Sequence, residues 1–186
     1  NVMLTKSGAK LLDFGLAKVR ESGAGPGSEL TSLPTEGAPL TGAGIRSFAA
    51  LACMQGVTTA TDLVNKLTEQ DCEVLEATLA DAACGIRLIP AFQAFHGTHA
   101  APLGAEHVKR LMPRSTDKLR YGLVKMTLDG SIQGFTARMR WPGHFNGAPN
   151  GIWVMAPAQY EADFETYHRA GLQIHTHTNG DEASAV

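Results

Sequence analysis

The amino-acid sequence predicts an α/β fold built on a mainly parallel sheet. From residue 45 onward, apolar and β-branched segments alternate with segments whose apolar residues have helical spacing. The predicted strands are apolar on both sides, as expected for strands with both faces covered. Gly56, Gly85 and Gly171 follow the predicted helices, at the position where glycine commonly ends a helix. Such alternation of strand and helix builds a parallel sheet with right-handed crossovers.

The first 44 residues have a different character. Residues 2–5 and 10–13 are short extended runs around a Lys6-Ser7-Gly8 turn, which indicates a β-hairpin within residues 1–19. Residues 20–44 are rich in Gly, Pro, Ser and Thr and contain few large apolar residues. Such a segment cannot bury enough surface to offset its ordering entropy, so we expect a flexible linker.

The elements of the α/β region follow in chain order. Val74, Leu75 and Leu79 have helical spacing, and Phe164 and Tyr167 fall on one face of a later helix. The connection between the second and third strands is the least defined, although His107 and His168 are expected on helix surfaces. We predict helices at 47–56, 69–83 and 157–170, the start of another at 181–186, and strands at 57–63, 86–95, 119–128 and 172–177.

Composition excludes several classes of function. The chain has 186 residues and a formal net charge of -2 without a basic run, so we expect neither a nucleic acid nor a membrane as partner. No apolar run approaches the roughly 18 residues that span a bilayer, and no secretory signal is visible, so we expect a cytoplasmic location. The chain begins with Asn1 rather than Met, so we expect its native start to be missing. The three cysteines form no C-x-x-C pair and are expected to be reduced and buried.

A D-F-G tripeptide at residues 13–15 follows Leu11-Leu12, and an asparagine stands twelve residues before its aspartate. This context resembles the Ser/Thr protein kinases, particularly those of bacteria. The resemblance implies that Asn1 and Asp13 match the residues that hold Mg²⁺ on the phosphates of ATP, and that residues 20–44 begin an activation loop. The Gly-rich loop, the strand lysine, the H-R-D motif and the A-P-E motif are absent from the chain, so Mg²⁺ and ATP would bind only to a complete kinase domain.

A second group of residues falls near the ends of the last two predicted strands. His175 and His177 are two residues apart, so they point to one face, and neutral imidazoles are good zinc ligands. The alternative is that one or both are hydrogen-bonded structural histidines. Lys125 is the only charge in the apolar run YGLVKMTL, so its amine must be paired, neutral or chemically altered. A structural salt bridge is the simpler alternative.

Two aspartates follow these strands. Asp129-Gly130 forms a tight turn directly after the third strand, which places Asp129 at the strand end, although it could simply cap the turn. Asp181 follows His177 in the segment HTNGDEA, where the chain turns toward the last predicted helix. We treat both aspartates as candidate catalytic-site residues.

Residues 45–186 resemble the metal-dependent amidohydrolases, in particular amidohydrolase family 3 and its N-substituted formamide deformylase branch. The segments concerned are GVTTATDL at 56–63, VKMTLDGSIQGFTARM at 124–139 and HTNGDEA at 177–183. The resemblance implies a (β/α)₈, TIM-type barrel, of which this chain would hold about strands two to five, with one or two divalent metals, often zinc. Lys125 matches a strand lysine that can be carboxylated to bridge two metals, and His177 a metal ligand. Asp129 and Asp181 match positions that shape the site.

The family reaction is hydrolysis of an amide-type, non-peptide C–N bond in a small molecule by metal-bound water. The family's first-strand H-x-H, its later strand histidine and its last-strand aspartate are not in this chain. We therefore expect an incomplete active site and an inactive fragment. The alternatives are a protein kinase fragment and a non-functional fusion of two partial domains. The oligomeric state stays open.

Two further sets of side chains have two interpretations each. His96 and His99 follow the second strand, where they would contact substrate or metal, or lie on a solvated loop. Residues 140–153 form a Gly-, Pro- and Asn-rich loop that would line a substrate pocket or be a surface loop anchored by its aromatic residues. These are Trp141, His144, Phe145 and Trp153.

Overall fold

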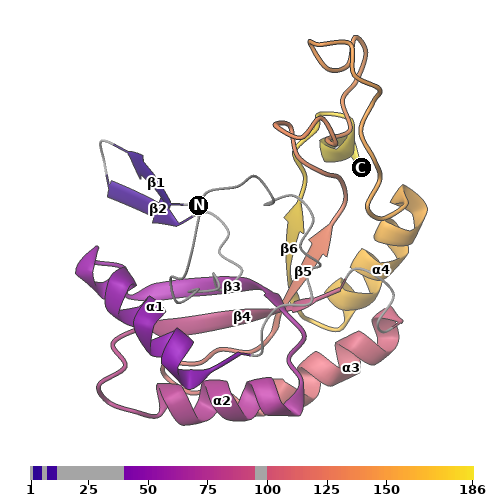
Figure 1. Ribbon diagram of the computed structural model, residues 1–186. Coiled ribbons are helices and arrows are strands. Elements are labelled where there is room, and N and C mark those ends of the chain that lie inside the picture. The colour runs from indigo at the N-terminus through magenta and orange to yellow at the C-terminus, as the bar shows by residue number, and fades with distance from the viewer. Residues whose placement is uncertain (1, 6–7, 12–39, 95–99) are drawn as a thin grey trace.

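The computed structural model describes residues 2–5, 8–11, 40–94 and 100–186 (Figure 1). Asn1, Asp13, His96, His99 and residues 20–39 of the predicted linker lie outside the described residues. The elements are β1 Val2–Thr5, β2 Gly8–Leu11, α1 Gly42–Met54, β3 Thr59–Asn65, α2 Glu69–Leu79, β4 Arg87–Gln93, α3 Ala101–Leu111, η1 Met112–Arg114, β5 Leu123–Thr127, α4 Pro157–Arg169, β6 Gln173–His177 and η2 Ala183–Ala185.

The predicted N-terminal hairpin is confirmed in the backbone. Strands β1 and β2 pair antiparallel, with Val2 opposite Leu11 and Thr5 opposite Gly8. The second strand begins at Gly8, two residues before the predicted position. A two-stranded hairpin occurs in many folds, so this element leaves the resemblance to protein kinases a prediction.

The predicted parallel sheet is also confirmed. Strands β3, β4, β5 and β6 lie side by side in chain order, and each neighbouring pair is parallel. The sheet is curled, because β3 and β4 run across the molecule while β5 and β6 rise steeply from it (Figure 1). Four parallel strands with this curl form a half-barrel, which is consistent with the expected partial α/β barrel.

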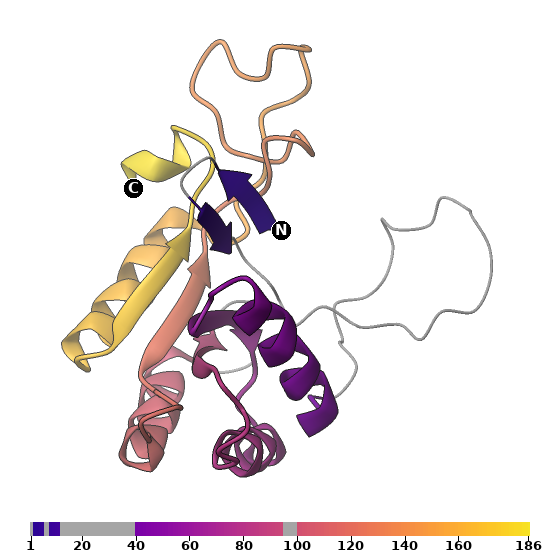
Figure 2. The same cartoon turned by 90° about the vertical axis from the view of Figure 1, so that its left-hand side faces the viewer.

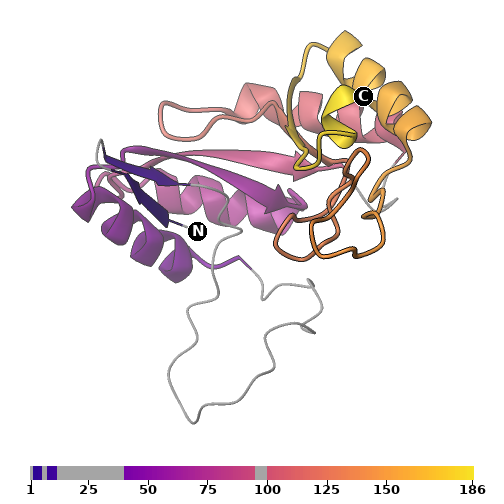
Figure 3. The ribbon, with the colours of Figure 1, turned by 90° about the horizontal axis from the view of Figure 1, so that it is seen from above.

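The main core lies between one face of this sheet and the four helices (Figures 2 and 3). Ile45 of α1, Leu75 of α2, Val108 of α3 and Tyr167 of α4 are buried in one cluster with strand residues that include Val124. The opposite face has only a small separate cluster, made of Leu63, Ala91 and Leu123, with Ile89 packed against it. This division leaves polar side chains on the face away from the helices.

The helix ends follow local sequence signals. The Thr41 side chain accepts a hydrogen bond from the Gly44 amide at 3.1 Å, so α1 begins at Gly42. The helix therefore starts five residues before the predicted position, and residues 42–44, assigned to the linker from the sequence, are helical. Thr68 and Asp71 form a reciprocal capping box at the start of α2. Gly171, with a φ of 77°, ends α4 as predicted.

Helix α3 is the element that the sequence pattern leaves undefined. It spans Ala101–Leu111 and buries Val108 and Leu111 against the sheet. His107 on this helix is half-buried rather than a surface residue. Its Nε2 lies 2.9 Å from the carbonyl oxygen of Leu67, which has a positive φ of 51°, so the histidine supports an unusual turn after β3.

Two smaller expectations are corrected. The helix predicted at 181–186 is a single 3₁₀ turn, Ala183–Ala185. Cys72 and Cys84 are buried as expected, but Cys53 lies on the exposed side of α1, and no disulfide joins them.

Within the described residues, no helix is both long and apolar enough to cross a membrane.

The core between sheet and helices should dominate stability. Leu88 in β4 is 1% exposed, so Leu88→Ala should lower the free energy of unfolding by about 2–4 kcal/mol, through lost burial and a residual cavity. Leu103 on α3 is 59% exposed, so Leu103→Ala should cost less than about 0.5 kcal/mol. Urea unfolding followed by circular dichroism measures both, and similar losses for the two variants would contradict this assignment of the core.

Candidate functional site

The predicted metal ligands lie on two neighbouring strands. Lys125 in β5 stands opposite His175 in β6, and Thr127 stands opposite His177. In-register residues of parallel strands point to the same side of a sheet. Lys125, His175 and His177 therefore share the face away from the helices, since their neighbours Val124 and Met126 are buried in the main core. The structure places Lys125 and His175 side by side at the middle of β5 and β6, and His177 at the carboxyl end of β6.

Their exposure differs along this face. Lys125 is 4% exposed, whereas His177 is half-buried and His175 is exposed. A buried ammonium is costly unless it is paired or neutralised, so the environment of Lys125 favours a modified or partnered amine. His175 lies on the edge strand of the sheet as described and is open to solvent.

His177 is oriented by the loop that follows β5. Its Nε2 lies 3.1 Å from the carbonyl oxygen of Gly130 and 2.9 Å from Nδ2 of Asn179. The side-chain amide of Asn179 also donates, through Nδ2, to the Gly130 carbonyl at 2.8 Å. If Nε2 carries the proton and donates to Gly130, the lone pair remains on Nδ1, where a metal could bind. The other tautomer, which accepts from Asn179, places the proton on Nδ1.

Asp129 is fully buried directly after β5. Its Oδ1 accepts from the backbone amide of Asn179 at 2.9 Å, and its Oδ2 accepts from the amides of Arg138 at 2.9 Å and Gly180 at 2.8 Å. These bonds tie the end of β5 to the loop after it and to the segment that follows His177. In this arrangement, Asp129 affects the site through the backbone that it holds.

Asp181 makes a related contact at the surface. It is exposed, and its Oδ1 accepts from the backbone amide of Arg140 at 2.8 Å. Gly180 beside it packs directly against the backbone of Arg138, so a side chain at position 180 would collide with that backbone. The segment after β6 and the loop after β5 thus interlock over several residues.

An ion pair that was not identified from the sequence completes this contact. The Arg138 guanidinium donates to Glu182 at 3.0 Å and to the Gly151 carbonyl at 3.0 Å, and it lies over the Trp153 ring at 5.0 Å. Asn150 donates to the second carboxylate oxygen of Glu182 at 2.9 Å. The Arg138 guanidinium, and then the Asn150 amide, lower the pKa of Glu182 below its ordinary value.

The aromatic residues of the loop divide into two pairs. His144 is 7% exposed, with Nε2 3.1 Å from the Ala137 carbonyl oxygen, and Trp153 packs under Arg138. Trp141 and Phe145 are each 94% exposed. Figure 1 shows this loop, between β5 and α4, rising beyond the carboxyl ends of β5 and β6. His144 and Trp153 therefore anchor the loop, while Trp141 and Phe145 are exposed to solvent.

The side chains on this face include residue types that can bind a metal. Across the described ranges, no three His, Cys, Asp or Glu side chains converge as a metal-binding group. Two imidazoles and one buried amine are suitable donors for a divalent metal, but they do not complete a coordination shell.

Comparison with known proteins gives a fold but not a family. The sequence matches no protein-family model and no curated protein. The fold is similar to an uncharacterized metal-dependent hydrolase from Pyrococcus horikoshii OT3, with a TM-score of 0.58 and 18% identity over 78% of this chain and 29% of that one. A second uncharacterized metal-dependent hydrolase, from Pyrococcus furiosus, has a similar fold, with a TM-score of 0.60 and 20% identity. That match covers 79% of this chain and 31% of the other. The chain thus spans about three tenths of each neighbour's length.

The Asp129 contacts make a specific prediction for stability. In Asp129→Asn, one acceptor oxygen is replaced by an NH₂ group that faces backbone donors, so unfolding free energy should fall by about 2–4 kcal/mol. Asp181→Asn is the matched control, because that exposed side chain accepts one bond, and it should cost less than about 1 kcal/mol. Equal losses in urea unfolding would contradict a special role for Asp129.

The Glu182 ion pair predicts a pH dependence. Because its folded pKa lies below the ordinary 4.5, the group stabilises the fold fully above pH 4.5 and loses this contribution as pH falls through the folded value. Wild type should therefore melt above Glu182→Gln at neutral pH, and the gap in Tm should close below pH 4.5. Differential scanning calorimetry from neutral to acidic pH measures the gap. A gap that persists unchanged in acid would show that the carboxylate charge is not its source.

Proposed function

We propose that this chain forms part of the active site of a metal-dependent hydrolase that cleaves an amide-type, non-peptide C–N bond in a small molecule. The supporting observation is the placement of Lys125, His175 and His177 on one face of adjacent parallel strands, with His177 at the carboxyl end of β6. Active sites of α/β barrels lie at this end of the strands. The similarity of fold to two metal-dependent hydrolases agrees with the proposal.

The proposed cofactor is a divalent metal, with zinc the first choice because imidazoles predominate among the donors. When bound, such a metal polarises a carbonyl group and lowers the pKa of a water molecule. His177 would offer Nδ1, provided that Nε2 donates to Gly130. Lys125 would contribute through a carboxylated amine, and the remaining ligands would come from elsewhere in the protein.

The two aspartates have supporting roles in this proposal. Asp129 holds the amides of Asn179 and Gly180, so it fixes the backbone that leaves His177. Asp181 holds the Arg140 amide and keeps the long loop against this segment. Both are positioning residues, since the groups that they contact are backbone amides of the protein itself.

Zinc binding provides the test. Competition with a chromogenic chelator should give saturable zinc uptake by the full chain, and His177→Ala or Lys125→Ala should weaken it by about 10-fold or more. His168→Ala is the control, because His168 is exposed and stacks on Phe164 of the same helix, α4. The proposal fails if wild type takes up no zinc, or if His168→Ala weakens uptake as much as His177→Ala does.

A second candidate is a zinc-binding fragment without turnover, and the incomplete set of donors among the described residues favours it. The two candidates differ in one measurable property. Zinc-loaded protein should release amine from N-formyl or N-acyl arylamines in the first case and should not in the second. Amine release that is lost in His177→Ala would decide for the hydrolase.

A further inference from the structure

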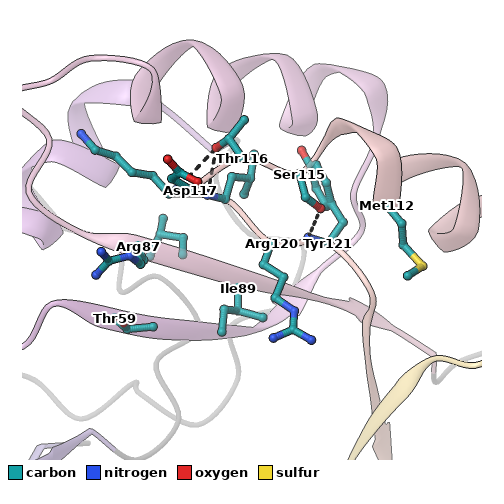
Figure 4. A pocket seen from close by; sticks show the side chains of 12 residues that line it. Thr59, Arg87, Ile89, Met112, Ser115, Thr116, Asp117, Arg120 and Tyr121 are labelled. Carbon is teal, nitrogen blue, oxygen red and sulfur yellow. Dashed lines mark hydrogen bonds between the residues drawn. The ribbon is translucent and has the colours of Figure 1, made fainter.

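A pocket lies at the other end of the sheet from Lys125 and His177. It has a volume of about 510 Å³ and lies between the first residues of β3 and β4 and the segment that connects η1 to β5 (Figure 4). Thr59 and Arg87 begin β3 and β4 and stand opposite each other in register. Because parallel strands place their amino ends at one edge, this pocket is separate from the proposed metal site.

Two arginines give the pocket its charge. Arg87 and Arg120 both line it and are exposed, and within the described ranges neither forms an ion pair. Asp117 is the acidic residue of the lining. Figure 4 shows Asp117 turned toward Thr116, whereas the two arginine side chains extend on the side of Thr59 and Ile89. A guanidinium without an acidic partner is well suited to bind a carboxylate or phosphate.

Two hydroxyl groups add donors to the wall. Ser115 Oγ accepts from the Tyr121 amide at 3.1 Å, and Thr116 Oγ1 accepts from the amides of Lys118 at 3.3 Å and Leu119 at 3.2 Å. Thr116 Oγ1 thus accepts two hydrogen bonds and Ser115 Oγ one, and the proton of each hydroxyl can be donated to a ligand.

The wall is held in place before any ligand binds. Arg114 forms ion pairs with Glu76 at 2.7 Å and with Glu69 at 2.9 Å, which fix η1 to α2. Lys118 donates to the carbonyls of Asp81 at 3.0 Å and Cys84 at 2.8 Å at the end of that helix. A preformed wall lowers the entropy cost of binding.

The rest of the lining is apolar. Ile89, which is half-buried, and Met112, which is exposed, give the pocket accessible apolar surface that a ligand consisting only of a charged group would leave in contact with water. The net charge of -2 and the absence of a basic run in the sequence argue against a nucleic acid here. An anionic group attached to an apolar body fits both sides of the pocket.

We propose that this pocket binds a small organic carboxylate, with Arg87 and Arg120 on the carboxylate and Ile89 and Met112 against the apolar body. The ligand site is independent of the proposed metal site, because it lies at the opposite ends of the strands. Its function does not require zinc or a hydrolytic reaction.

Isothermal titration calorimetry of the full chain tests the proposal with three probes. Benzoate should bind saturably, and benzamide, its neutral counterpart, should bind about 10-fold more weakly because it lacks the charge. Inorganic phosphate should also bind more weakly than benzoate, since it has no apolar body. Equal affinities for benzoate and benzamide, or no saturable binding of benzoate, would overturn the proposal.

Variants locate the binding. Arg87→Gln and Arg120→Gln should each weaken benzoate binding by about 10-fold, while Arg110→Gln should leave it unchanged. Arg110 is the matched control, because it is exposed on α3 and forms no ion pair within the described residues. Circular dichroism checks that each exposed variant is folded. The same loss in Arg110→Gln would show a general charge effect and refute the site.

Discussion

The hydrogen bonds to the buried carboxylate of Asp129 are the interaction on which the carboxyl end of the half-barrel depends. A carboxylate removed from water is stable only when its oxygens accept strong hydrogen bonds. Here they accept three, from the backbone amides of Arg138, Asn179 and Gly180. One side chain thereby joins the end of β5, the long loop after it and the segment after β6. The orientation of His177 and the Arg138–Glu182 ion pair both follow from this junction.

The two ends of the curled parallel sheet carry side chains of different chemistry. Helices α1, α2, α3 and α4 pack on one face, so the other face can carry polar side chains at both ends. From the middle of β5 and β6 to the carboxyl end of β6 lie Lys125, His175 and His177, which are donors suited to a cation. At the amino ends lie Arg87 and Arg120, which are suited to an anion. A parallel sheet permits this arrangement because every strand runs in the same direction.

Local signals in the sequence predicted much of the fold. The β-branched and apolar runs predicted β3 to β6, and the glycine at 171 predicted the end of α4. The sequence pattern does not define helix α3, and it predicts too late a start for α1, because that helix begins at the Thr41 cap with small residues. His107 was expected at the surface, since its contact with Leu67 joins residues 40 positions apart. Contacts of that range leave no local pattern.

The sequence by itself determined the α/β class, the parallel strands and the residue types suited to a metal, because these depend on local periodicity and side-chain chemistry. Only the tertiary structure decided which of these residues meet. It placed Lys125 opposite His175, engaged Asp129 with backbone amides, and paired Arg138 with Glu182 across 44 positions. It also placed Arg87 and Arg120 in one pocket. The physical reason is that strand register and loop packing are set by the whole core, and no single segment specifies them.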